Sequence, residues 1–152
     1  YSKMMKKILI VIIFVLTSCG YQPLYSNKNS NKIVFKKIEL IGDRNINNKI
    51  ISGTFIDQNS EQYTHEKIIL KNTKEVIETS KDAKGQPDTY KMTITLTVLI
   101  ENKQNNIREI VITEDFSYKN LENKFDLSEY EINVQRDLLK KISDELIIYL
   151  SL

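Results

Sequence analysis

Residues 90–100 read YKMTITLTVLI, and their alternation of apolar and polar side chains decides the fold class. Side chains at every second position of a strand point to the same face, so the apolar residues share one face and the threonines and lysine share most of the other. This pattern predicts an antiparallel strand with one buried and one exposed face. A sheet of that kind buries its apolar face under helices or under a second sheet.

The segments on both sides of this strand continue the sheet. Residues 66–79 carry two apolar groups, and the turn-rich sequence KDAKGQPD at 81–88 joins them to the central strand as a hairpin. Residues 107–118 alternate again after a polar turn at 103–106, which predicts a second hairpin. A first strand is expected at 32–41, where KIVFKKIELI is rich in β-branched residues.

A short amphipathic helix is predicted at residues 43–59. Asp43 or Asn45 can cap its first free amides, and Gly53 is interpreted as a point of close packing against the sheet. The residues that recur at helical spacing are Ile46, Ile50, Ile51 and Phe55.

A longer helix is predicted at residues 127–150. Asp126 and Glu129 have the spacing of a capping box, which would fix its start. The element order is then β-α-β-β-β-α. We therefore predict an α+β two-layer sandwich, with a four-stranded sheet covered on one face by two helices. The apolar stripe of the long helix is Tyr130, Val134, Leu138, Leu139, Ile142, Leu146, Tyr149 and Leu150.

Composition and motifs argue against several classes of function. The net charge of +2 includes Lys3, Lys6 and Lys7, without which 19 basic residues face 20 acidic ones, so the basic excess of a nucleic-acid binder is absent. His65 is the only histidine, is expected in a surface loop, and belongs to no metal or nucleophile motif. The carboxylates show no paired spacing for acid–base chemistry. We expect a protein that is not an enzyme and holds no cofactor.

The N-terminal sequence is typical of a bacterial lipoprotein. Lys6 and Lys7 precede the apolar run ILIVIIFVL at 8–16, which is too short for a hydrocarbon core that needs about 20 helical residues. The following Leu16-Thr17-Ser18-Cys19 has the order of a lipobox, whose cysteine is acylated before cleavage. An ordinary signal peptide with a chance cysteine is the alternative. We expect a signal peptide at 1–18, an acylated N-terminus and tether at 19–31, and one domain at 32–152.

Three segments together resemble the lipopolysaccharide-assembly lipoproteins of the LptE family. They are CGYQPLY at 19–25, GQPDTYKM at 85–92 and EINVQRDL at 131–138, and the resemblance in element order spans nearly all of 19–152. It implies a palmitate-bearing lipoprotein of the outer membrane that faces the periplasm, lies within the lumen of the LptD β-barrel, assists its assembly and takes part in lipopolysaccharide transport. It also implies lipopolysaccharide binding by basic residues, for which Lys84, Lys91 and Arg136 are the candidates here.

The sequence also allows other interpretations. The lysines near the hairpin tip are either phosphate-binding donors or ordinary solvated turn residues. The chain could also be a stand-alone, periplasm-facing lipoprotein that binds a lipid or small ligand between helices and sheet. A third possibility is a scaffold for peptidoglycan or another envelope complex. Gly20, which follows the acylated position, favours the outer membrane over the inner one.

Overall fold

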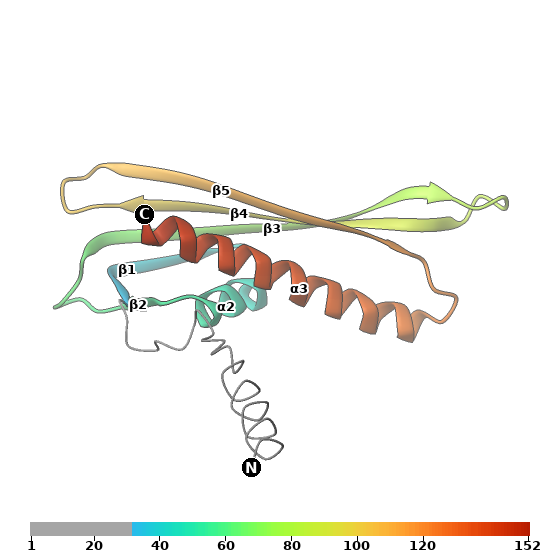
Figure 1. Cartoon of the computed structure of the whole chain (residues 1–152), viewed down its shortest axis with the longest axis horizontal. Helices are drawn as coiled ribbons and strands as arrows, with labels where there is room; N and C mark the ends of the chain where they lie inside the picture. Colours follow the sequence, from blue (N-terminus) through green and yellow to red (C-terminus); the bar gives the residue numbers. More distant parts are fainter. Residues whose placement is uncertain (1–31) are drawn as a thin grey trace, which may run out of the picture. The chain divides into compact units, whose positions relative to one another are not determined.

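The computed structural model describes residues 32–152, so the predicted signal peptide, Cys19 and the tether lie outside the described residues. The predicted α+β class is confirmed: one sheet carries two helices on the same face (Figure 1). The elements in chain order are β1 (Ile33–Ile41), α2 (Arg44–Gly53), β2 (Ile56–Gln58), β3 (His65–Lys81), β4 (Pro87–Glu101), β5 (Ile107–Lys119) and α3 (Lys124–Ser151).

The sheet has five strands in the order β2-β1-β3-β4-β5, one more than predicted. The additional strand, β2, pairs in parallel with β1 and comprises three residues. It lies inside the segment predicted as the first helix, which instead ends at Gly53 and is capped by the extended residue Thr54. The helical spacing of Phe55 is therefore accidental, and Ile56 reaches the core from a strand.

Helix α2 begins as predicted at one of its two candidate caps. The carboxylate of Asp43, not Asn45, caps it by accepting hydrogen bonds from the amides of Asn45 and Ile46 at 2.7 and 3.0 Å. Gly53 does mark a close approach, but the neighbour is α3 and not the sheet. A Cβ at this position would lie 3.0 Å from the hydroxyl of Ser143 on α3.

Helix α3 begins earlier than predicted. The side chain of Asn123 accepts a hydrogen bond from the amide of Phe125 at 2.9 Å and is the N-cap. The proposed capping box of Asp126 and Glu129 was wrong, because Asp126 already lies in the first helical turn. There its negative charge stabilises the helix through the macrodipole without capping it.

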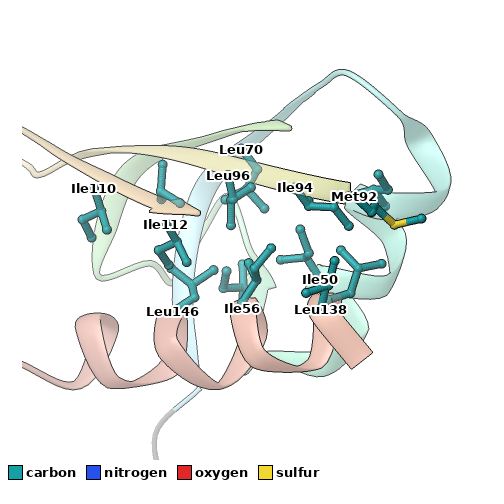
Figure 2. Packing of buried hydrophobic residues seen from close by; sticks show 14 of the residues in the cluster. Ile50, Ile56, Leu70, Met92, Ile94, Leu96, Ile110, Ile112, Leu138 and Leu146 are labelled. Carbon is teal, nitrogen blue, oxygen red and sulfur yellow. The ribbon is translucent and has the colours of Figure 1, made fainter. Parts of the chain in front are cut away.

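The hydrophobic core lies between the sheet and the two helices. The alternation predicted for β4 is confirmed, since the even-numbered residues from Met92 to Ile100 are all buried while the residues between them are half-buried. Figure 2 shows Ile94 and Leu96 of β4 on the side of the sheet that faces Ile50 of α2 and Leu138 and Leu146 of α3. Burying one Leu or Ile side chain contributes about 1.5–3 kcal/mol, so this layer supplies most of the favourable free energy of folding. Completely buried members include Phe35, Ile46, Ile50, Ile68, Leu70, Ile94, Leu96, Ile142 and Leu146.

A buried polar junction fixes the passage from β1 to α2. The side-chain oxygen of Asn72, on β3, accepts the amide of Asp43 at 3.1 Å, and its nitrogen donates to the Asp43 carbonyl at 3.0 Å. Gly42 lies between them with φ +100°, and a Cβ there would come within 2.3 Å of the Asn72 carbonyl oxygen. The turn therefore requires glycine at position 42. The hydrogen bonds of Asn72 to Asp43, the N-cap of α2, hold the start of this helix against β3.

Strands β3 and β4 are longer than the region that the helices cover. All residues from Thr73 to Lys81 are exposed, including the apolar Val76 and Ile77. Figure 1 shows this hairpin projecting past α2. We call residues 74–91 the hairpin arm, and the part of the sheet that packs against α2 and α3 the covered half.

Candidate functional site

The tip of the hairpin arm is a rigid turn built by Asp82. Its carboxylate accepts the amides of Lys84 and Gln86, both at 2.8 Å, and its own amide donates to the Gln86 carbonyl at 2.8 Å. Gly85 supplies the positive φ of +78° that the turn requires. Lys84 is consequently held at the most distal part of the arm with an exposed side chain.

Lys91 has a different setting from Lys84. It lies on β4, on the sheet face that α2 and α3 leave uncovered, opposite Ile77 of β3 and Ser117 of β5. Its ammonium group is 3.1 Å from the carboxylate of Asp115. Part of its charge is therefore already compensated.

Arg136 lies on α3, which covers the other face of the sheet, and it is exposed. The structure thus places Lys84, Lys91 and Arg136 at the tip, on the uncovered face and on the helix layer, respectively. It does not bring the three into one site. Within the hairpin arm, four lysines are balanced by four acidic residues, so the arm as a whole carries no net charge.

The uncovered face of the sheet carries a cross of threonines. Thr95 of β4 lies in register between Thr73 of β3 and Thr113 of β5, and the hydroxyls of Thr95 and Thr113 are 3.1 Å apart. Thr93 and Thr97 extend the same face along β4. The stripe on β4 is evident from the sequence, but its continuation onto the neighbouring strands depends on register. The result is a neutral surface with hydroxyl donors and acceptors.

A tyrosine cluster joins the hairpin arm to the covered half. The rings of Tyr90 and Tyr130 lie 5.8 and 5.9 Å from that of Tyr118. The Tyr118 hydroxyl is 2.7 Å from the carboxylate of Glu131 on α3, to which it donates. Burial, reinforced by this hydrogen bond, holds the pKa of Tyr118 well above its usual range. Tyr130, predicted in the core, is 40% exposed at the edge of this cluster.

A second group of lysines, not anticipated from the sequence, lies at the opposite end of the sheet from the hairpin tip. The ring of Tyr63 contacts two ammonium groups, those of Lys36 and Lys103, at 5.2 and 4.7 Å from its centre. Glu66 is 3.0 Å from Lys36, and its hydrogen bond and charge raise the pKa of that lysine. The lysines come from β1 and from the β4–β5 turn, far apart in sequence, which is why no motif reveals them.

A shallow hollow of 380 Å³ adjoins this group and shares Lys36 and Glu66 with it. Its lysines are largely paired, because Glu39 bridges Lys37 and Lys67 at 2.8 and 2.9 Å. Hydrogen bonds from these two lysines lower the pKa of Glu39. Exposed pairs of this kind contribute little to stability, and they leave little positive charge to attract a ligand. The residues that line the hollow are Lys36, Lys37, Glu66, Lys67, Glu101 and Asn105.

A hollow of 210 Å³ between β5 and α3 is more apolar than the hollow lined by lysines. Phe116, Tyr130 and Val134 contribute to its lining, and the pair of Lys141 with Glu114, at 3.7 Å, lies nearby. Ligand pockets usually measure about 300–1,000 Å³, so this hollow is too small for a lipid. A second hollow, of 260 Å³, lies where Tyr149 and Leu150 of α3 approach Ile33 of β1 and Ile107 of β5, and it too is below that range. Elsewhere the helices and sheet close against each other through fully buried side chains.

His65 is the first residue of β3 and does not lie in the loop where it was predicted. Its ring packs at 5.2 Å from that of Phe35, and its Nδ1 is 3.0 Å from the Thr64 hydroxyl. Among residues 32–152, no group of three histidine, cysteine or acidic side chains is arranged to hold a metal ion. No helix in this part of the chain has the length and apolarity needed to cross a membrane.

Solved structures of bacterial lipoproteins have the same fold as this chain. Rare lipoprotein B from Shewanella oneidensis aligns with a TM-score of 0.58 and 8% identity, over 76% of this chain and 93% of that chain. The minor lipoprotein from Acinetobacter baumannii aligns with a TM-score of 0.52 and 14% identity, over 77% and 89% of the two chains. The uncharacterized lipoprotein B from Nitrosomonas europaea aligns with a TM-score of 0.53 and 15% identity, over 80% of this chain and 86% of that chain.

No family model matches the chain, and no curated protein matches it in sequence. The structural likeness therefore shows the fold: residues 32–152 adopt the α+β architecture found in these bacterial lipoproteins. It covers most of each neighbour's length, so the fold is shared across nearly the whole domain.

Proposed function

We propose that this chain is an outer-membrane lipoprotein, acylated on Cys19, that plugs an LptD-type β-barrel, assists its assembly and takes part in lipopolysaccharide transport. The observation that carries the proposal is the combination of a lipobox with a domain fold found in bacterial lipoproteins. The sequence CGYQPLY at the expected mature start supports the same assignment. The protein acts by filling and binding, without catalysis.

The uncovered face supports the plug role. The lumen of an outer-membrane barrel is polar, so a plug needs a polar surface that exchanges hydrogen bonds without a large net charge. The threonine cross around Thr95 provides such a surface. Acylation of Cys19 would keep the domain at the membrane, since each buried methylene of an acyl chain contributes about 0.8 kcal/mol.

Affinity purification from outer membranes tests the plug role directly. The full lipoprotein, extracted in mild detergent and washed with moderate salt, should retain one large β-barrel protein at near-equal amounts. A Thr95→Glu variant places an unpaired charge at the centre of the cross and should reduce barrel recovery several-fold. The matched control is Lys49→Glu on the exposed surface of α2. Recovery of the lipoprotein without any barrel would refute the proposal.

Lipopolysaccharide binding is assigned first to Lys84, since it is exposed at the arm tip and forms no ion pair within residues 32–152. Lys84→Glu should weaken binding more than Lys91→Glu, because Asp115 already compensates the charge of Lys91. Arg136→Glu should have the smallest effect. Binding of purified lipopolysaccharide to the detergent-solubilised protein measures the order. If all three variants bind lipopolysaccharide with the affinity of the wild type, these residues do not belong to the binding site.

The alternative of a stand-alone lipid carrier is weaker. Such a protein needs an enclosed apolar cavity, whereas the core here is closed and the two hollows beside α3 have volumes of 210 and 260 Å³. Recovery of the lipoprotein from membranes with a bound lipid and without a barrel would favour this alternative.

A further inference from the structure

Strand β5 forms a long and regular edge of the sheet. Its register with β4 runs without a shift from Ile107 to Lys119, it contains no proline, and no strand of residues 32–152 pairs with its other side. The opposite edge strand, β2, has only three residues, and the outer part of β3 has register shifts between Glu78 and Lys81. A regular edge presents a row of unpaired amides and carbonyls, which is a template for another strand.

The middle of this edge is favourable for strand pairing. Residues 110–113 read IVIT, carry no charge and are all β-branched, and Val111 is 57% exposed on the uncovered face. Charged residues stand on both sides of this stretch. Among them Glu109 forms no ion pair within residues 32–152, whereas Asp115 is paired with Lys91. A neighbouring strand is therefore favoured if it places an apolar side chain beside Val111 and a basic one beside Glu109.

The hollow of 210 Å³ between β5 and α3 lies beside the same edge. Phe116 and Tyr130 in its lining are 43% and 40% exposed, so the hollow is open from outside. A strand paired with β5 would point every second side chain toward the helix layer. Since a cavity of about 150 Å³ holds a benzene molecule, this hollow has room for one aromatic side chain. Asp137, also in the lining, offers an acceptor for the hydroxyl of a tyrosine or the indole N–H of a tryptophan.

These features fit an extended polypeptide segment better than a lipid or a second copy of the chain. The hollow is too small for a lipid. A second β5 paired antiparallel about Val111 sets Ile107 opposite Asp115, and pairing about Ile112 sets Glu109 opposite Asp115. The proposed function also places a single copy in the barrel lumen. There, the edge of β5 can be reached by segments of the barrel polypeptide itself.

We propose that β5 pairs with an extended segment of the barrel partner, which adds a sixth strand to the sheet and places an aromatic side chain in the hollow beside Phe116. This is strand addition, in which main-chain hydrogen bonds supply affinity and a side-chain pocket supplies specificity. The inference rests on the proposed function for the identity of the partner. It adds a directional contact through the β5 edge to the side-chain contacts of the threonine cross.

Photo-cross-linking of the full lipoprotein in outer membranes tests the pairing. The photoreactive residue p-benzoylphenylalanine replaces Ile107 or Ser117, two exposed positions of β5 that are ten residues apart. Paired strands rise equally per residue, so both adducts should map by mass spectrometry to one barrel segment, at sites about ten residues apart. The matched control is Lys71 on β3, which lies on the same sheet face two strands from the edge and should not label that segment.

The outcomes separate this pairing from the proposed function. Barrel that is retained on purification but forms no adduct at Ile107 or Ser117, or forms them in unrelated segments, would overturn the pairing alone. Absence of the barrel from the purified material would refute both.

Filling the hollow tests the aromatic contact. Asn133 lines the hollow, and Asn133→Trp would occupy it with the protein's own indole, which should lower the adduct yield at Ser117 several-fold. Lys140→Trp, on the exposed surface of α3, is the matched control and should keep the yield. Thermal unfolding of both variants verifies that the fold is intact. An unchanged yield in a folded Asn133→Trp variant would exclude an aromatic side chain in the hollow.

Discussion

The covered half and the hairpin arm are built largely from the same two strands, yet different interactions determine their structures. In the covered half, β3 and β4 place Ile68, Leu70, Ile94 and Leu96 entirely out of water under α2 and α3. In the arm, the same strands expose every residue from Lys74 to Lys81 on β3, and the tip is organised by Asp82. Tertiary packing therefore stabilises one region, and pairing with local turn chemistry stabilises the other.

This contrast determines which parts of the chain tolerate substitution. Substitutions in the covered half act through cavities and unsatisfied polar groups, which cost several kcal/mol. Substitutions in the arm act mainly on exposed side chains and should leave the fold intact. The arm is therefore the region where binding residues such as Lys84 are separable from stability.

Truncation of a core side chain should produce the largest loss of stability. Ile142, on α3, is fully buried, and Ile142→Ala should lower the free energy of unfolding by about 2–5 kcal/mol through lost burial and a cavity. Urea denaturation followed by circular dichroism measures the change. Val76→Ala in the arm is the control, with an expected effect of about 0.5 kcal/mol or less. Similar losses in both variants would contradict the division into two regions.

The covered half was the more predictable region from sequence. The alternation from Met92 to Ile100 and the stripe of α3 report burial directly, because a residue that is buried must be apolar at the period of its element. Boundaries were less predictable. A three-residue strand such as β2 is too short for periodicity, and its pairing with β1 depends on tertiary contacts.

The candidate site was only partly predictable. The tip of the arm follows from turn residues that are local in sequence, so the position of Lys84 was expected. The ion pair of Lys91 with Asp115 depends on the register of β4 with β5, and the placement of Lys36 and Lys103 around Tyr63 depends on the whole sheet. Sequence periodicity reports neither of these arrangements.

Gly42 at the junction with α2 and Gly85 at the tip of the arm both have positive φ, so replacing each by alanine compares the two regions by loss of stability. An L-residue in this conformation costs about 1–2 kcal/mol, so both Gly42→Ala and Gly85→Ala should destabilise the protein. A Cβ at Gly42 also lies 2.3 Å from a carbonyl oxygen of β3, and such overpacking costs about 1–3 kcal/mol more. A Cβ at Gly85 would have no atom within 4 Å apart from those of its chain neighbours. Thermal unfolding of both variants should show the larger decrease for Gly42→Ala, and the reverse order would contradict the assigned junction.

The buried Asn72 junction should show an intermediate effect. Asn72→Ala removes both hydrogen bonds to the backbone of Asp43 and leaves buried groups without partners, at a cost of about 1–3 kcal/mol. Amide hydrogen exchange should increase first in α2, which the junction holds. Ser80→Ala in the arm is the matched control, because the Ser80 hydroxyl contacts that of Thr89 at 2.7 Å on an exposed surface. Unchanged protection of α2 in Asn72→Ala would show that packing alone holds the helix.

Tyr118 lies where the two regions meet, and its replacement should have the smallest effect, visible mainly in the dependence on pH. Tyr118→Phe removes the hydrogen bond to Glu131, worth about 1–2 kcal/mol near neutral pH. Because the folded state raises the pKa of Tyr118, its stabilising contribution is complete below the unfolded value of about 10 and is lost as the pH rises above it. The wild-type free energy of unfolding should therefore fall more steeply above pH 10 than that of Tyr118→Phe.

Tyr130→Phe, altered at a 40% exposed position in the same cluster, should retain the wild-type slope. Parallel alkaline profiles for wild type and Tyr118→Phe would mean that the phenol is solvated, and that the arm meets the covered half without a sealed boundary.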